Sequence, residues 1–150
     1  MTVEKAIKNV LSKTFEKLFD IDKLRFESIA IKQDVIENIM LLAKENHPNE
    51  FVVFLDGKII NKKLVIDGLL YQEYIASENA AAPIFHFPDK TFYGSAHSHP
   101  GYSNRPSTAD RQFFRKMGIV NLIICRPYDI SSIKFYDHEG EEINVVIEEE

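Results

Sequence analysis

The chain has 150 residues, enough for one domain with a complete hydrophobic core. Hydrophobic residues make up 45% and charged residues 27%, and the net charge of −5 comes without any basic block, which argues against nucleic acid as the main partner. No apolar stretch is long enough to span a membrane and the N-terminus lacks an apolar signal core, so we expect a cytoplasmic protein with no membrane partner. Cys125 is the single cysteine, which excludes an internal disulfide and fits a reducing compartment.

The first twenty residues carry an amphipathic pattern. Apolar side chains recur at three- and four-residue steps between lysines and glutamates, which predicts a helix over residues 2–20. Two interpretations stay open: the helix packs on its own domain, or it binds a partner, including a second copy of the chain in a homodimer. We therefore expect a single domain over residues 1–150, with residues 1–27 as an N-terminal helical extension.

Two further helices are predicted with clear ends. The first covers residues 33–46 and should end near His47, because the residue before a proline disfavours the α region. The second begins at Ser107, where Ser-x-x-Asp is a capping signal, and ends near Met117 with Gly118 as its stop.

Strands fill most of the remaining sequence. Asp56-Gly57 predicts a hairpin turn, Ala80–Pro83 a loop and Glu148–Glu150 a frayed acidic tail. The expected strands cover residues 24–31, 51–55, 58–66, 69–76, 90–99, 120–125, 132–136 and 143–147. For the strand over 58–66, an interruption at Asn61-Lys62-Lys63 is the alternative. This order of elements predicts an α/β (α+β) domain in which one mixed sheet is flanked by helices.

The segment from Ser95 to Asp110 contains residue types that bind metals. His97 and His99 lie two positions apart near the end of a predicted strand, so their side chains should point the same way. A loop and a helix start then bring Asp110 back toward them. Two imidazoles and one carboxylate, with a fourth position for water, form a ligand set typical of catalytic zinc. The alternatives are a chance His-x-His pair and an Asp110 that only completes a capping box, and these residues alone do not decide.

A hydrolytic zinc site also needs a group that accepts a proton from water. Glu50 is the best candidate, because it stands at the head of the apolar strand Phe51–Leu55, where a carboxylate is costly unless it has a role or a partner. The alternative is that the first residue of the strand is still solvated.

Together, Glu50, His97-Ser98-His99-Pro100, Ser107 and Asp110 resemble the JAMM motif of the JAB/MPN zinc metalloproteases in residue type and spacing. The resemblance extends from about Gln33 to Ile147 and is closest to the compact archaeal and bacterial members. It implies a single MPN/JAB-like domain with a mixed curved sheet and an architecture related to cytidine deaminases. Deamination itself is excluded, because the chain lacks both His-x-Glu and Pro-Cys-x-x-Cys.

The resemblance also implies a role for each motif residue. His97, His99 and Asp110 would bind one Zn²⁺, with water as a fourth ligand. Glu50 would take a proton from this water and later give it to the leaving amine. Ser107 would hydrogen-bond the oxyanion, although it is also the natural N-cap of its helix.

Members of this family cut peptide or isopeptide bonds at the C-terminal tail of ubiquitin or ubiquitin-like small modifiers. The resemblance thus implies a zinc metallopeptidase with deubiquitinase-like isopeptidase activity. A processing peptidase for the tail of a sulfur-carrier protein and, less favoured, a non-catalytic MPN scaffold are the alternatives. We expect the strand over 69–76 either to bind the tail by strand addition or to be an ordinary sheet strand. Cys125 should be a buried residue rather than a nucleophile, and His47, His86 and His138 are given no role.

Overall fold

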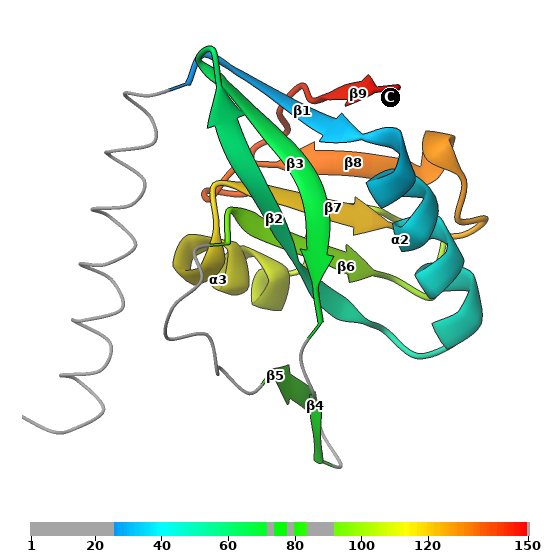
Figure 1. The fold of residues 1–150 in the computed structure, drawn as a ribbon. Helices are drawn as coiled ribbons and strands as arrows, with labels where there is room; N and C mark the ends of the chain where they lie inside the picture. The colour runs from blue at the N-terminus through cyan, green and yellow to red at the C-terminus, as the bar shows by residue number, and fades with distance from the viewer. Residues whose placement is uncertain (1–25, 72–73, 78–79, 84–91, 150) are drawn as a thin grey trace, which may run out of the picture.

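The computed structural model describes residues 26–71, 74–77, 80–83 and 92–149, so the predicted helix over 2–20 lies outside the described residues. Within them, a seven-stranded mixed sheet runs in the order β8-β7-β6-β2-β3-β1-β9 (Figure 1). The strands are β1 (Ser28–Lys32), β2 (Val52–Ile60), β3 (Lys63–Leu70), β6 (Gly94–Ser98), β7 (Val120–Ile124), β8 (Ile133–Tyr136) and β9 (Val146–Glu148). The pairs β1–β3, β1–β9 and β6–β7 are parallel and the others antiparallel, which confirms the predicted fold class.

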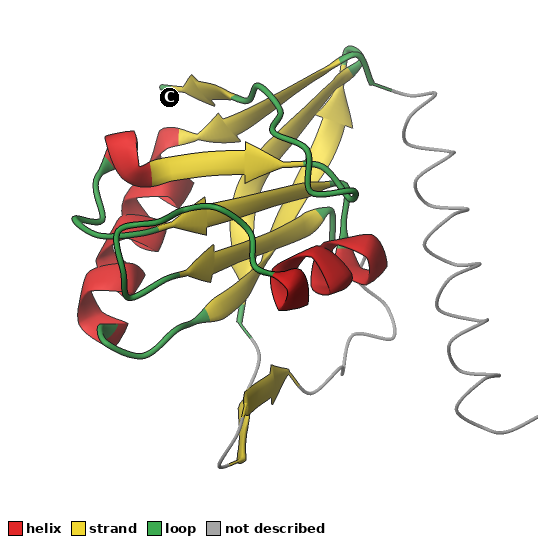
Figure 2. Cartoon of the chain, turned by 180° about the vertical axis from the view of Figure 1, so that it is seen from behind, coloured by secondary structure: helices red, strands yellow, loops and turns green. Residues whose placement is uncertain are grey.

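Two helices cover opposite faces of this sheet. Helix α2 (Gln33–Asn46) lies on one face, and α3 (Thr108–Met117) lies across the other, as the view from behind shows (Figure 2). Both helices have the predicted ends: α2 stops at His47, and Ser107 is the N-cap of α3. A short 3-10 turn, η1 (Ile130–Ser132), leads into β8. No helix in the described ranges is long and apolar enough to cross a membrane.

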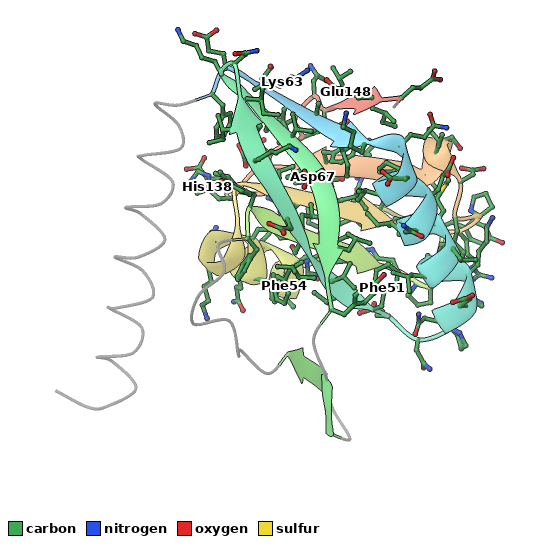
Figure 3. All side chains as sticks on the ribbon, viewed as in Figure 1. Phe51, Phe54, Lys63, Asp67, His138 and Glu148 are labelled. Carbon is green, nitrogen blue, oxygen red and sulfur yellow. The ribbon has the colours of Figure 1, made fainter. Side chains whose placement is uncertain are left out.

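Strand alternation divides the core into two parts. In β7, Leu122 and Ile124 join the large apolar cluster under α2, whereas Ile123 packs with Phe114 of α3 on the other face. Phe51, directly before β2, contributes to the α2 side, and Phe54 within β2 lies near Phe113 of α3, with ring centroids 6.3 Å apart (Figure 3). Each face of the sheet therefore has its own buried layer, as expected for a sheet flanked on both sides.

The predicted turn at Asp56-Gly57 is wrong. β2 runs through both residues with a shift of register between them, and the hairpin turn falls at Asn61 and Lys62, whose φ angles are +48° and +60°. Gly57 is needed for close approach instead, because a Cβ there would lie 2.4 Å from the carbonyl oxygen of Val65. The glycine marks a bulge inside a long strand and not the end of a short one.

Three other sequence predictions also differ from the structure. The strand predicted over 69–76 is divided: Leu69 and Leu70 end β3, and β4 (Tyr74–Ser77) belongs to a separate two-stranded sheet. Ala80–Pro83 is not a loop but β5, the partner of β4. Glu148 is not in a frayed tail but in β9, where its carboxylate forms ion pairs with Lys32 and Lys63 (Figure 3).

The ion pairs of Glu148 predict a pH-dependent stability. Hydrogen bonds from Lys63 and Lys32 hold the pKa of Glu148 below its usual 4.5. A carboxylate whose pKa is lowered in the folded state stabilises the fold at pH values above its unfolded-state pKa. This contribution is lost as the pH falls through the folded-state pKa. We expect Glu148→Gln to lower Tm by about 1–2 °C near pH 7 and by less near pH 3.

Thermal unfolding followed by circular dichroism at both pH values checks this prediction. Glu142→Gln is the matched control, because Glu142 forms one exposed ion pair with Lys134 at 3.5 Å. An equal loss of Tm at both pH values in Glu148→Gln would contradict the electrostatic explanation.

Candidate metal centre

Asp110 lies where the end of β6 meets the start of α3, and its carboxylate is the meeting point of three groups. His99 Nε2 is 2.9 Å from Asp110 Oδ2, and His97 Nδ1 is 3.9 Å from Asp110 Oδ1. The backbone N–H of Ser107 also donates to Oδ2, at 2.9 Å. The structure therefore brings the side chains of His97 and His99 together with Asp110, which lies 13 and 11 positions after them in the sequence.

Local sequence explains this arrangement. His97 is the fourth residue of β6, and all five residues of this strand are buried. The ladder stops at the Pro100–Pro106 loop, because a proline cannot donate a backbone hydrogen bond. The Ser107 hydroxyl then accepts from the backbone N–H of Asp110 at 3.0 Å, which begins α3 and fixes Asp110 in its first turn. Asp110 thus completes the capping box and faces the histidines with the same carboxylate.

The charges of the cluster are coupled. Burial favours a raised pKa for Asp110, but the hydrogen bonds from His99 and Ser107 and the nearby imidazoles outweigh it and lower the pKa to about 2. The hydrogen bond to Asp110 raises the pKa of His99, against the opposing effect of burial. Asp110 is therefore an anion at neutral pH and attracts a positive charge to the His99 side of the cluster.

His97 has the opposite electrostatic environment. Its side chain is 6% exposed and lies edge-on to Phe113 and Phe114, with centroid distances of 4.9 and 5.4 Å. Burial lowers its pKa to about 4, although the Asp110 charge opposes this shift. His97 is therefore a neutral imidazole at neutral pH, which is the form that binds metal ions.

Glu50 lies in the loop just before β2, so the solvated alternative given for it is the one observed. It is exposed, and β2 begins two residues later at Val52. Its charge contributes to the raised pKa of His99, which places it on the same side of the molecule as the cluster. The neighbouring Phe51 is fixed to β6, because its N–H donates to Ser98 Oγ at 2.9 Å and its carbonyl accepts from Ser98 N–H at 3.1 Å. The Ser98 hydroxyl thus holds the Glu50 loop instead of facing the cluster.

A second contact ties the Glu50 loop to the histidine strand. Tyr128 is buried, and its hydroxyl lies 2.7 Å from His47 Nδ1 and 3.4 Å from the carbonyl oxygen of His99. The loop that carries Glu50 is therefore held at both ends, at His47 and at Phe51. No role was given to His47 from the sequence, and only the fold shows that it meets Tyr128, 81 positions away.

The side chains of the cluster carry donor atoms of the kinds that zinc binds. Among the described residues, no three His, Cys, Asp or Glu side chains already form a metal-binding arrangement, and His99 and Asp110 contact each other directly. The donor chemistry nevertheless fits zinc. His99 Nδ1 lies 2.9 Å from the Ser103 carbonyl oxygen and so carries a proton, which leaves a lone pair on Nε2 in the neutral ring. The 3.9 Å between His97 Nδ1 and Asp110 Oδ1 is too long for a hydrogen bond and somewhat wider than the roughly 3.3 Å between two ligands of a tetrahedral cation with bonds of about 2 Å.

One polar residue near the cluster was not predicted from the sequence. Asn121 is fully buried in β7, and its Oδ1 lies 2.6 Å from Ser95 Oγ, which in turn lies 2.7 Å from His97 Nε2. An amide inside the apolar run Val120–Cys125 was the available signal, because a buried amide requires hydrogen-bond partners. Cys125, by contrast, is buried as expected, and burial raises the pKa of its thiol.

Comparisons with known proteins identify the family of the chain. Residues 32–137 match the family of prokaryotic homologs of the JAB domain. A protein from Haloferax volcanii described as a probable metalloprotease is 31% identical over 128 residues, which cover 77% of this chain and 76% of that protein.

Solved structures give the same result. A structure described as JAMM, a metalloprotease-like zinc site in the proteasome and signalosome, is similar with a TM-score of 0.65 and 31% identity, covering 81% of this chain and 99% of that one. A JAB1/MPN domain protein from Archaeoglobus fulgidus has a TM-score of 0.64 and 30% identity, covering 81% and 98%. The chain therefore belongs to the prokaryotic JAB-domain family and is a compact metallopeptidase of the JAMM (JAB/MPN) type.

Proposed function

We propose that this protein is a zinc-dependent peptidase that hydrolyses peptide or isopeptide bonds at the C-terminal tail of a ubiquitin-like small modifier. The observation that supports this most is the convergence of His97 and His99 on Asp110, with the Glu50 loop attached to the same strand. We further propose that the chain acts as one domain over residues 1–150, with residues 1–27 as an extension, in the cytoplasm.

Each motif residue has a task in the proposed reaction. His97, His99 and Asp110 hold one Zn²⁺, which when bound supplies a Lewis acid and lowers the pKa of its water to about 7. The Glu50 carboxylate accepts a proton from the attacking water and then gives it to the leaving amine. Glu50 is exposed, so both water and a substrate tail can reach it.

Ser107 can serve two purposes with one hydroxyl. As the N-cap it accepts a hydrogen bond from the Asp110 N–H, and this uses a lone pair of the oxygen. The hydroxyl proton is not used by that bond, so it is available for donation to the oxyanion. We propose that Ser107 both begins α3 and stabilises the developing negative charge.

The proposed tail site is an edge of the main sheet, in place of the strand predicted over 69–76. β1 pairs with β3 only from Lys63 to Ile66, whereas Gly68–Leu70 pair with β2 alone among the described strands. An extended tail has backbone groups that fit such an edge by strand addition, and the absence of side chains in a Gly-Gly end allows close approach. The alternative function, trimming of the tail of a sulfur-carrier protein, would use the same tail site. The other alternative, a non-catalytic scaffold, is disfavoured because all residues of the motif are present.

Cleavage should require the metal. Purified protein should bind one zinc per chain and cleave a fusion in which a ubiquitin-like modifier with a Gly-Gly tail precedes a reporter. Removal of zinc by a chelator should abolish cleavage, and stoichiometric zinc should restore it. Metal analysis and a gel-based cleavage assay measure both effects, and cleavage that persists in the chelated protein contradicts the proposal.

Comparison of two substrates separates the proposed reaction from the sulfur-carrier alternative. One substrate carries the modifier on a lysine side chain, and the other carries a linear C-terminal extension. Faster cleavage of the lysine-linked substrate is expected for an isopeptidase. Cleavage of the linear substrate alone indicates a processing peptidase.

Cleavage should also require the proton acceptor. Glu50→Gln should lower kcat by about 10²- to 10⁴-fold, because the amide cannot accept the proton, while zinc stoichiometry stays at one. Glu45→Gln is the matched control, an exposed glutamate on α2 that we expect to leave kcat unchanged. Wild-type kcat in Glu50→Gln would exclude the role given to Glu50.

Two variants separate the two tasks of Ser107. Ser107→Ala loses the cap and the hydroxyl and should reduce both kcat and stability, the latter by about 1 kcal/mol. Ser107→Asn keeps a good N-cap without a hydroxyl, so it should recover most of the stability but not kcat. If Ser107→Asn recovers both, Ser107 is only a cap.

A further inference from the structure

A buried chain of polar groups lies behind His97, on the face of the sheet that α3 covers. Ser95 and His97 are two residues apart in β6 and share this face, and Asn121 stands opposite Ser95 in the β6–β7 register. Ser95 and Asn121 are 0% exposed, and His97 is 5% exposed. Water cannot compete for these hydrogen bonds, so their directions are set by the protein alone.

The directions follow from the Asn121 amide. Its Nδ2 group donates to the carbonyl oxygen of Gly118 at 3.3 Å, which fixes the nitrogen on that side and Oδ1 on the other. Oδ1 has no proton, so the Ser95 hydroxyl must donate to it across the 2.6 Å contact. A hydroxyl has one proton, and therefore Ser95 Oγ must accept from His97 Nε2 across the 2.7 Å contact.

The proton of His97 is thereby assigned to Nε2. Its Nδ1 keeps a free lone pair, and this atom faces Asp110 Oδ1 at 3.9 Å. We propose that Ser95 and Asn121 are positioning residues that hold His97 in the Nε2–H tautomer, so that Nδ1 is the atom offered to the metal. The proposal rests on the proposed zinc site and adds residues that act on that site through His97.

The hydrogen bonds from Asn121 through Ser95 to His97, here called the relay, let Asn121 influence zinc binding although it is not itself a ligand. Without the amide acceptor, the Ser95 hydroxyl is free to donate to Nε2, which moves the ring proton to Nδ1 and blocks the metal-binding atom. Without the Ser95 hydroxyl, nothing donates to Nε2, and the ring is only less well oriented. Asn121→Leu should therefore damage zinc binding more than Ser95→Ala, and adding Ser95→Ala to Asn121→Leu should recover affinity.

Two measurements on the full chain test this inference. Long-range ¹H–¹⁵N correlation spectra of the metal-free protein near pH 7 identify the His97 tautomer, and competition with a chromogenic chelator gives the zinc Kd. The variants are Asn121→Leu, Ser95→Ala and the double variant. Ser132→Ala is the control, because it removes a buried hydroxyl in η1 that the relay does not use.

We expect Nε2–H in the wild type and a shift toward Nδ1–H in Asn121→Leu. The zinc Kd should rise about 10- to 100-fold in Asn121→Leu, less in Ser95→Ala, and in the double variant only to the Ser95→Ala level. Ser132→Ala should match the wild type. If Asn121→Leu does not fold, the His97 tautomer in the wild type and the zinc Kd of Ser95→Ala still test the inference.

Three outcomes would overturn the inference: Nδ1–H in the wild type, an unchanged Kd in Asn121→Leu, or a double variant weaker than both single variants. Failure of the proposed zinc site is distinguishable from these. A wild-type protein that binds no zinc refutes that site, whereas the tautomer in the metal-free protein is measured independently of zinc.

Discussion

The carboxylate of Asp110 is the contact on which both the start of α3 and the metal centre depend. Oδ2 accepts from the Ser107 N–H and meets His99 Nε2, and Oδ1 faces His97. A capping carboxylate is ordinarily a matter of helix stability alone. Here the same carboxylate also contacts His99, so the first turn of α3 is joined directly to the residue that follows β6.

The two faces of the sheet have different tasks. The face under α2 holds the larger apolar cluster, which includes Ile36 and Ile39, and supplies most of the core. The face under α3 contains His97, Ser95 and Asn121 among aromatic rings. Burial there keeps His97 neutral, and hydrogen bonds within the protein compensate the polar groups for the loss of water. The face under α2 thus provides most of the apolar core, and the face under α3 carries the polar residues of the metal site.

Features governed by local chemistry were predictable from the sequence. Both helices have the expected ends, because periodicity, a proline after His47 and a capping box at Ser107 are local signals. The Asp56-Gly57 turn failed because tertiary packing gave Gly57 another use, the close approach of β3. Glu148 was misassigned for a similar reason, since its lysine partners lie 116 and 85 positions away.

The metal site shows the same difference between features set by local sequence and features set by contacts between distant residues. Spacing was enough to expect His97, His99 and Asp110 on one side of the molecule, because a strand, a loop and a capped helix connect them. Asn121 and Tyr128 were not predicted, because their contacts depend on the pairing of β6 with β7 and on a fold that brings His47 to Tyr128. Sequence thus indicates candidate ligands, whereas the groups that orient them emerge only with the register of the sheet.

The central claim is that Asp110 and the two histidines hold one zinc ion beside Glu50. Anomalous diffraction from crystals of the zinc-loaded protein, collected on both sides of the zinc absorption edge, tests it most directly. The account predicts one anomalous peak per chain, within bonding distance of His97 Nδ1, His99 Nε2 and Asp110, with Glu50 facing its open side. A peak elsewhere, or full zinc loading without a peak between these side chains, would contradict it.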